Sequence, residues 1–268
     1  MSPSYPISWW YIVLYSVNNS YSGGIVLDKK RRIDLLLIEH AFAESIKKAQ
    51  ALVMAGVVFV NGHRAPKPST LVEGGSSIEV RGKLEYVSRG GIKLAHALLQ
   101  FGILGTDKVA LDVGASTGGF TDCLIQRSVR HVYALDVGKG QIAYTIRQNP
   151  KVTVIEKVNA RYPFSLPEQI DLATIDVAFI SLTNILKSVS THLKADGQIL
   201  CLVKPHFEAK REEVGRGGII KDPALHATIL GRIITWCTKN QFRVKNLTTS
   251  PITGEAGNKE FFLLLSIS

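Results

Sequence analysis

Short apolar runs, separated by polar segments, recur through the C-terminal two thirds of the chain. Each has five to nine residues, a length that suits a β-strand, and run 109–113 is apolar enough to predict a strand buried on both faces. We expect three helices: one that ends at about Gln100, one that begins at Gly119 and one that begins at Asp222-Pro223. Around Gly254 and Gly257 the last two strands form an antiparallel hairpin. The predicted strands are 109–113, 131–136, 152–156, 172–176, 197–204, 241–249 and 261–267.

A different pattern precedes these strands. Its first helix carries an apolar stripe at Ile33, Leu36, Leu37 and Phe42. Ser45 can cap a second helix over 46–55, and Gly56 can end it. A strand at 57–60 then turns at Asn61-Gly62, and residues 78–80 return beside it. We therefore predict a small α+β domain at 31–82, a linker at 83–87 and an α/β domain at 88–268.

Residues 1–30 fit neither domain. The apolar segment 8–16 is far shorter than the ~20 residues that a membrane span needs, and no basic residue precedes it, as a signal peptide would require. The alternatives are a disordered or loosely docked extension and an artefact of an upstream start codon.

Charge and cysteine content narrow the class of protein. The formal net charge of +10 over 268 residues indicates an anionic partner, with nucleic acid favoured over a membrane surface. Cys123, Cys201 and Cys237 are far apart and match no zinc or disulfide pattern. We therefore expect a cytoplasmic protein with no metal site.

The strand 109–113 leads into a glycine turn that predicts a cofactor site. Gly114 and Gly118-Gly119 let the backbone approach a ligand, and the helix that follows offers free N–H groups. Asp136 ends the next strand, where an acidic side chain can bind both ribose hydroxyls. The spacing is wider than that of a dinucleotide site, and Asp112 would repel a pyrophosphate but could face a cation. S-adenosylmethionine fits these demands, and the alternative is an ordinary βα turn.

Two segments carry a family resemblance: Leu111 to Cys123, LDVGASTGGFTDC, and Ala134 to Gly140, ALDVGKG. They resemble the TlyA family of ribosomal RNA 2′-O-methyltransferases, which are often named hemolysins and are related to the FtsJ/RrmJ ribose methyltransferases. The resemblance implies a class I methyltransferase fold, with a mostly parallel seven-stranded sheet and a C-terminal antiparallel hairpin. We expect S-adenosylmethionine to be bound by Asp112, Gly114, Ala115, Ser116, Gly118, Gly119, Phe120, Asp136, Val137 and Asn159.

The small N-terminal domain resembles the S4-type RNA-binding domain. The resemblance lies in the segments RIDLLL from Arg32, AESIKKA from Ala43 and VNG from Val60. Ile46 departs from the family, which usually has Arg there, so one expected phosphate contact is missing. An exposed basic face without a ligand is the alternative interpretation. The expected partner is ribosomal RNA or a ribosomal subunit, bound by Arg31, Arg32, Lys47, Lys48, Asn61, Arg64, Lys67, Arg89 and Arg216.

Polar residues end several strands of the predicted sheet. Asp112, Asp136, Asp176 and Lys204 lie at or near carboxyl ends, where α/β sheets bind ligands. The family resemblance adds Lys93 and Glu260, so we expect a catalytic tetrad of Lys93, Asp176, Lys204 and Glu260. One lysine could be the base for the ribose hydroxyl or stabilise the forming alkoxide, and the carboxylates would orient the lysines.

Residues 205–219 resemble a family loop, and we expect a glycine-rich lid over RNA and cofactor or, alternatively, a plain connector. Three other functions are weighed: a membrane-active hemolysin, a non-catalytic RNA-binding protein on a methyltransferase fold, and an NAD enzyme. The sequence offers no membrane span, the tetrad is intact and the glycine spacing disfavours NAD. We expect a monomeric enzyme.

Overall fold

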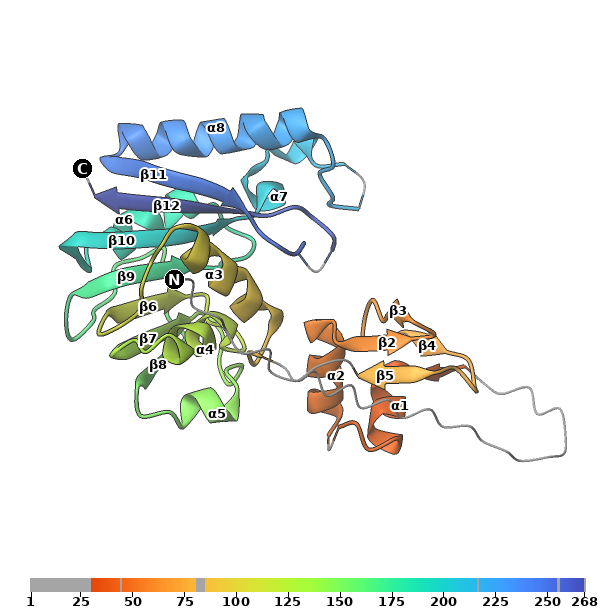
Figure 1. Ribbon diagram of the computed structural model, residues 1–268. Coiled ribbons are helices and arrows are strands. Elements are labelled where there is room, and N and C mark those ends of the chain that lie inside the picture. Colours follow the sequence, from red (N-terminus) through yellow and green to blue (C-terminus); the bar gives the residue numbers. More distant parts are fainter. Residues whose placement is uncertain (1–29, 44, 81–84, 216, 255, 268) are drawn as a thin grey trace, which may run out of the picture. The chain divides into compact units, whose positions relative to one another are not determined.

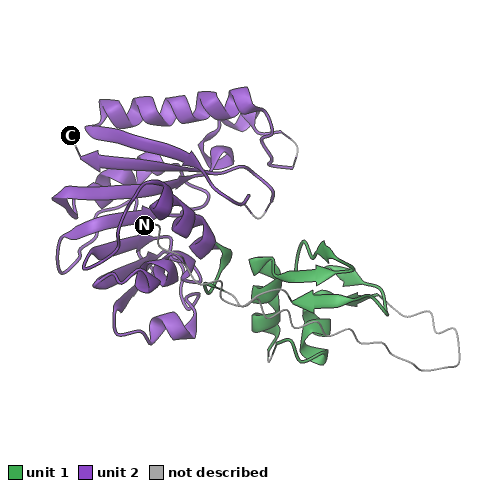
Figure 2. Ribbon diagram, viewed as in Figure 1, with its two compact units in different colours: residues 1–89 green, residues 90–268 purple. Residues whose placement is uncertain are grey.

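The computed structural model describes residues 30–43, 45–80, 85–215, 217–254 and 256–267. Contacts divide the chain into two compact units, residues 1–89 and 90–268 (Figure 2). Residues 1–29 of the predicted N-terminal extension, and Lys83 and Leu84 of the predicted linker, lie outside the described residues.

The first unit is a small α+β fold. Helices α1 (Ile33–Glu39) and α2 (Ile46–Ala55) pack on each other. Strands β2 (Val58–Val60), β3 (His63–Arg64) and β5 (Ile78–Val80) form an antiparallel sheet in the order β3-β2-β5. Strands β1 (Arg31–Arg32) and β4 (Leu71–Val72) pair separately. The apolar stripe forms the core, because Ile33 and Leu37 are fully buried together with Ala49 and Val58.

Local signals set the limits of α2 and the first hairpin as predicted. The Ser45 side chain accepts a hydrogen bond from the Lys48 N–H, at 3.3 Å, and so caps the helix. Gly56 ends it with a left-handed φ of 74°. Asn61 and Gly62 both have positive φ, 49° and 77°, which suits a two-residue turn between antiparallel strands.

The second unit contains a seven-stranded sheet in the order β11-β12-β10-β9-β6-β7-β8 (Figure 1). Five strands are parallel: β6 (Val109–Val113), β7 (His131–Asp136), β8 (Val152–Glu156), β9 (Ile170–Ile175) and β10 (Leu193–Val203). The last two, β11 (Phe242–Thr249) and β12 (Phe261–Ile267), form the predicted antiparallel hairpin, and β12 runs antiparallel to β10. The predicted sheet is confirmed.

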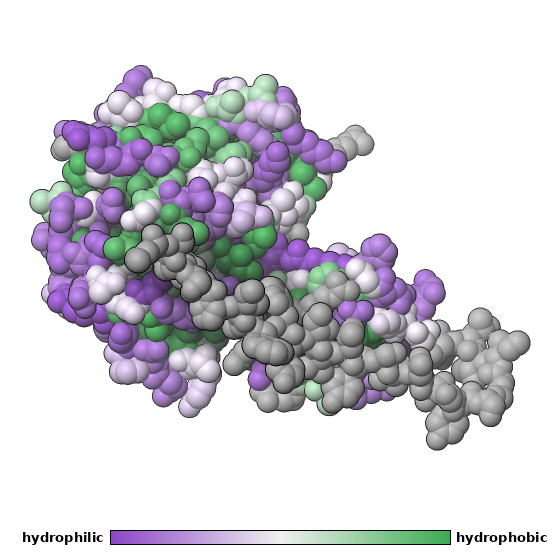
Figure 3. All heavy atoms as spheres, viewed as in Figure 1, coloured by the Kyte–Doolittle hydropathy of each residue, from purple (hydrophilic) through white to green (hydrophobic). Residues whose placement is uncertain are grey.

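Helices cover this sheet and complete its core. They are α3 (Arg89–Gln100), α4 (Gly119–Gln126), α5 (Tyr144–Arg147), α6 (Leu186–Ser190), α7 (Pro205–Glu208) and α8 (Pro223–Lys239), with short 3-10 helices η1 (Leu182–Asn184) and η2 (Arg211–Glu213). Helix α8 packs on β11, α4 on β6 and β7, and α6 on β10. The centre is apolar: Leu111, Ile175, Ile199 and Ile229 are fully buried. On the face in Figure 3, hydrophilic residues surround smaller hydrophobic patches, as on most folded surfaces.

The chain reverses direction across the sheet at β6. After β6 it proceeds outward through β7 and β8, and it then returns to place β9 on the other side of β6. Such a reversal opens a crevice beyond the carboxyl ends of the strands, where ligands of α/β proteins bind. The carboxyl ends of β6, β7, β9 and β10 therefore position the site described next.

The segment 205–219 differs from the predicted loop. It contains the helical turns α7 and η2, because Pro205 stands at the first turn of α7 and Glu213 folds back to accept a hydrogen bond from the Lys210 N–H at 2.8 Å. The glycines that suggested a long loop are confined to its last part. Strand β10 also begins four residues earlier than predicted, with an irregularity in its pairing between Leu193 and Gln198.

Candidate active site

Lys204 and Asp176 form an ion pair at the carboxyl ends of neighbouring parallel strands. Lys204 directly follows β10 and Asp176 directly follows β9. The Lys204 Nζ lies 2.5 Å from the Asp176 Oδ1, and both side chains are mostly buried, with 15% and 22% exposed. A lysine that ends an apolar strand is costly to desolvate unless it is paired, and Asp176 provides that pairing.

Lys93 and Glu260 form a second and more deeply buried pair. Their Nζ and Oε2 atoms are 2.5 Å apart, and the side chains are only 11% and 3% exposed. Lys93 comes from α3, whereas Glu260 directly precedes β12. Because Phe261 is paired with Val203, Glu260 and Lys204 are the next residues outward on adjacent antiparallel strands. Strand register thus brings the second pair to the same end of the sheet as the first.

The glycine turn between β6 and α4 reaches the end of β9. Gly114 has φ of 84°, and a Cβ added there would lie 2.3 Å from the carbonyl oxygen of Asp176. Gly118 has φ of 94°, and its Cβ would lie 3.1 Å from Ile142. Both positions need glycine, since other residues are strained at such φ values and Gly114 has no room for a side chain.

Asp136, on the neighbouring strand β7, forms a hydrogen bond with the glycine turn. Its Oδ2 accepts a hydrogen bond from the Ser116 N–H at 2.7 Å, and its Oδ1 accepts one from the Gly138 N–H at 2.6 Å. Each carboxylate oxygen has a further lone pair, so Asp136 can still accept hydrogen bonds from two hydroxyl groups. The glycine turn and Asp136 together fit a ribose-containing cofactor without a pyrophosphate.

Asp112 is placed differently from the expectation that it faces a cation. It is completely buried, and its two oxygens accept hydrogen bonds from the hydroxyls of Thr121 at 2.6 Å and Thr174 at 3.0 Å. Burial raises the pKa of Asp112 to about 7, and the negative charge of Asp176 adds to this effect while the two hydroxyls oppose it. Its carboxyl joins α4 to β9 inside the protein.

The other predicted cofactor residues divide between surface and interior. Val137 is 68% exposed, Ser116 and Asn159 are exposed, and the Asn159 Oδ1 accepts a hydrogen bond from the Arg161 N–H at 3.0 Å. Ala115 and Gly119 are buried in the turn. Phe120 is buried, with 3% of the residue exposed, and its ring stacks on that of Phe262 with 6.2 Å between ring centres. This contact joins α4 to β12 in the interior of the unit.

Sequence reasoning missed an exposed aromatic ring that lies against Phe207, a neighbour of the first ion pair. Phe179 is 90% exposed and has a left-handed φ of 62°, which is unusual for a bulky residue. Its ring centre lies 4.9 Å from that of Phe207, and the Lys204 Nζ lies 5.9 Å from the Phe207 ring centre. In the sequence, Phe179 stands beside the apolar Ala178 and Ile180, so nothing distinguishes it from a core residue.

Several predicted RNA contacts have partners within the first unit. Arg31 pairs with Glu39 and Arg32 pairs with Asp34, each at 2.6 Å. The amide of Asn61 donates a hydrogen bond to the Ser76 hydroxyl and accepts one from the Ser77 N–H, directly before β5.

The remaining predicted RNA contacts are placed as follows. The guanidinium of Arg64 lies across Gly56 at the end of α2. Lys47, Lys48 and Lys67 are exposed, Arg89 begins α3, and Arg216 lies outside the described residues.

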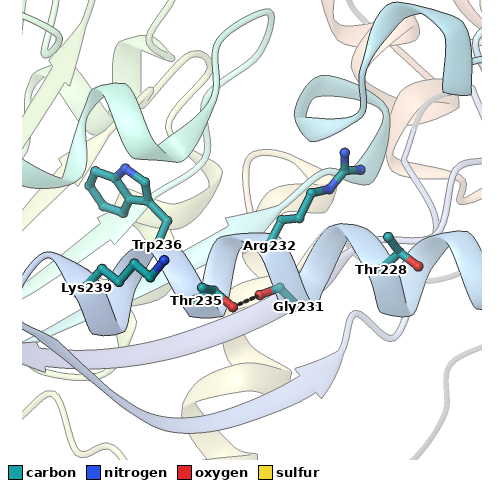
Figure 4. Close-up of a pocket in the computed structure, with 6 residues that line it drawn as sticks. All are labelled: Thr228, Gly231, Arg232, Thr235, Trp236 and Lys239. Carbon is teal, nitrogen blue, oxygen red and sulfur yellow. Dashed lines mark hydrogen bonds between the residues drawn. The ribbon is translucent and has the colours of Figure 1, made fainter.

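An open pocket lies elsewhere on the second unit, along the outer face of α8 (Figure 4). It is lined by Thr228, Gly231, Arg232, Thr235, Trp236 and Lys239. None of the predicted site residues lines it. The paired lysines and the glycine turn at the strand ends therefore remain the candidate active site.

Comparison with known proteins identifies the family. The FtsJ-like methyltransferase family matches residues 86–267, and the S4 domain matches residues 31–78. YqxC of Bacillus subtilis is 45% identical over 88% of this chain and 86% of its own length. The 16S/23S rRNA (cytidine-2′-O)-methyltransferase TlyA of Mycobacterium tuberculosis is 38% identical over 88% of this chain and 90% of its own length.

A solved structure agrees with these sequence matches. A protein from Streptococcus thermophilus that carries the designation hemolysin is 40% identical and superposes with a TM-score of 0.70. The match covers 90% of this chain and 89% of that one. The chain belongs to the TlyA family of FtsJ-like methyltransferases and carries an S4 domain.

Proposed function

We propose that this protein transfers the methyl group of S-adenosylmethionine to the 2′-oxygen of a ribose in ribosomal RNA. The observation that carries the proposal is the placement of the Lys204–Asp176 and Lys93–Glu260 pairs at one end of the sheet, where Gly114 touches the backbone of Asp176. The relative from M. tuberculosis is named for the same reaction on cytidine in 16S and 23S rRNA.

The cofactor is proposed to bind at the glycine turn. When bound, S-adenosylmethionine would supply an electrophilic methyl group on a sulfonium. The backbone of Gly114 to Gly118 would lie against it, and Asp136 would accept hydrogen bonds from the ribose hydroxyls. The dipeptide Gly118-Gly119 at the start of α4 carries no side chain that blocks close approach.

The tetrad is proposed to act on the attacking hydroxyl. A ribose hydroxyl is a poor nucleophile until its proton leaves, so a lysine amine can serve as general base or an ammonium can stabilise the alkoxide. Asp176 and Glu260 hold the two lysine side chains in place from neighbouring elements. Fixed placement matters because methyl transfer is an in-line displacement that depends on orientation.

RNA is proposed to contact both units. The S4 domain supports RNA binding by the first unit, where Lys47 and Lys67 are exposed. In the second unit, the exposed ring of Phe179 offers a surface on which a nucleobase can stack, and it lies against Phe207, whose ring centre is 5.9 Å from the Lys204 Nζ. An aromatic ring at this position would hold the nucleotide whose ribose faces the lysines.

The test is methyl transfer to ribosomal RNA from a strain that lacks this protein. We expect the purified protein to transfer a tritiated methyl group and to make one phosphodiester bond per modified nucleotide resistant to alkali. Methylation of a base nitrogen or carbon would contradict the proposal, and so would binding of NAD in place of S-adenosylhomocysteine in calorimetry. As for the designation hemolysin, no helix among the described residues is long and apolar enough to cross a membrane.

A further inference from the structure

Glu208, at the end of α7, is a carboxylate held largely out of water without a cation. Its Oε2 accepts a hydrogen bond from the Ser181 hydroxyl at 2.6 Å, and its Oε1 accepts one from the Leu182 N–H at 2.7 Å. Within the described parts of the chain, no Lys, Arg or His forms an ion pair with it. Burial raises the pKa of Glu208, although the two hydrogen bonds oppose that rise. Such a group is costly to retain, so its contacts need an explanation.

The contacts of Glu208 belong to a series that joins two chain segments. The first segment, 176–182, follows β9, and the second, 204–208, follows β10. Asp176 meets Lys204 at 2.5 Å, Phe179 meets Phe207 at 4.9 Å between ring centres, and Ser181 meets Glu208 at 2.6 Å. In each pair the second residue stands 27 or 28 positions after the first, so the two segments run side by side. Glu208 makes the last of these contacts, at the end away from the strands.

The first segment needs such a restraint. Phe179 has a φ of 62° and a side chain that is 90% exposed, so burial of its ring does not stabilise this backbone conformation. Strained residues persist only where their surroundings fix them, and they are concentrated at functional sites. Asp176 fixes the chain before Phe179, and the two hydrogen bonds to Glu208 fix it directly afterwards.

We propose that Glu208 is a positioning residue for the reaction: through Ser181 and Leu182 it fixes segment 176–182, and with it the ring of Phe179, against Phe207 in the segment that begins with Lys204. This inference rests on the proposed methyl transfer to RNA. The hydrogen-bond partners of Glu208 are Ser181 and Leu182, and neither belongs to the proposed cofactor site, so we expect Glu208 to act on the RNA step and to leave cofactor binding unchanged.

Two substitutions separate the hydrogen bonds from the volume of the side chain. Glu208→Met keeps the volume and removes both acceptors, and we expect kcat/KM for ribosomal RNA to fall ~10- to 100-fold, as misplaced groups typically cause. Glu208→Gln keeps a carbonyl acceptor for the Leu182 N–H. Its amide can donate to Ser181, whose hydroxyl can turn to Thr183, 2.8 Å away. Glu208→Gln should therefore restore most of the lost activity, and S-adenosylhomocysteine should bind equally to all three proteins.

A matched control lies in the same segment of the chain. Glu213 also accepts two hydrogen bonds, from the Lys210 N–H at 2.8 Å and from Arg232 at 2.7 Å, and neither donor belongs to segment 176–182. Glu213→Met removes the same number of bonds, and we expect it to leave methyl transfer nearly unchanged.

Two measurements distinguish positioning from a general loss of stability. Amide hydrogen exchange in residues 177–186 should accelerate in Glu208→Met and stay slow in Glu208→Gln and Glu213→Met. The activity losses of Glu208→Met and Phe179→Ala should not multiply in the double variant, because both act through the same ring. If Glu208→Met does not fold, Ser181→Ala removes one of the two bonds from the other side and should give the same pattern, with a smaller loss.

The inference is overturned if Glu208→Met retains full turnover, if its loss multiplies with that of Phe179→Ala, or if exchange in 177–186 is unchanged. These outcomes are separate from failure of the proposed function. If the parent protein does not methylate ribosomal RNA, the proposed function fails whatever the exchange experiment shows.

Discussion

Gly114 lies directly against the main chain of Asp176, so that a Cβ on Gly114 would be 2.3 Å from the carbonyl oxygen of Asp176. The two residues follow the neighbouring parallel strands β6 and β9. The turn proposed to hold the cofactor is therefore in contact with the residue that holds Lys204. A change at Gly114 should disturb both parts of the site at once.

Gly114→Ala should impair cofactor binding and stability together. The left-handed conformation alone costs an alanine ~1–2 kcal/mol, and the clash with Asp176 must add to this. We expect a larger loss than this in the free energy of unfolding, measured by urea titration, and weakened binding of S-adenosylhomocysteine in calorimetry. Gly102→Ala is the control, because Gly102 has a φ of 64° but open space around it. Equal effects of the two substitutions would show that the contact is unimportant.

Asp136→Ala should weaken cofactor binding while the protein stays folded. The substitution removes the acceptors for the ribose hydroxyls and for the N–H groups of Ser116 and Gly138. Hydrogen bonds to a charged group contribute ~1.5–3 kcal/mol each, so the Kd of S-adenosylhomocysteine should rise at least ~10-fold. An unchanged Kd in calorimetry would place the ribose elsewhere.

Lys204→Ala should abolish most methyl transfer and leave S-adenosylhomocysteine binding intact. Loss of a positioned base typically costs ~10²–10⁴ in rate. Lys204→Arg should not restore the rate if Lys204 is the base, because arginine does not lose its proton in proteins. Methyl incorporation into ribosomal RNA measures both variants.

A second lysine–aspartate pair, at the opposite ends of the same two strands, provides a control for Lys204. Lys194, in β10, pairs with Asp171, in β9, at 2.7 Å. Lys194→Ala removes an equivalent pair away from the site and should leave turnover within about twofold, because partly exposed ion pairs contribute little. If Lys194→Ala and Lys204→Ala reduce turnover equally, the role of Lys204 is structural.

Asp112→Asn should make stability less dependent on pH. The pKa of Asp112 is about 7 in the folded protein and is near 3.8 for an ordinary Asp. Between these values the unfolded chain loses the Asp112 proton first, so stability falls as pH rises from about 4 to about 7. An Asn side chain cannot ionise. The melting temperature of the Asp112→Asn variant, relative to that of the parent protein, should therefore increase with pH over this range, by at least ~2–4 °C. A difference that stays constant with pH would show that Asp112 ionises normally.

Lys47→Ala should mainly affect RNA binding, whereas Arg32→Ala should mainly affect stability. Lys47 is exposed, and removing one phosphate contact should lower the salt slope of RNA binding by ~1. Arg32 instead holds Asp34, whose side chain is fully buried and also bonded to Gln50. Arg32→Ala should mainly lower thermal stability, since it leaves a buried carboxylate without its cation. Salt titrations of RNA affinity and thermal melts measure the two effects.

The sequence by itself determined the elements of both units. Short apolar runs specified the strands of the second unit. The cap at Ser45, the stop at Gly56 and the turn at Asn61-Gly62 are local signals, so they act without the rest of the fold. It also indicated that residues ending parallel strands gather at one edge, because this follows from topology alone. The resemblance to TlyA proteins added Lys93 and Glu260, which no spacing could have paired.

Only the tertiary structure decided which side chains meet. Asp112 and Asp136 lie at or near the carboxyl ends of parallel strands, yet Asp112 is buried between two threonines and Asp136 binds the exposed turn. Phe120 and Phe179 both follow strands, yet one is core and the other is 90% exposed. The predicted basic face is partly neutralised by Glu39 and Asp34. Burial and pairing depend on neighbours that are distant in the sequence, and a local pattern carries no information about them.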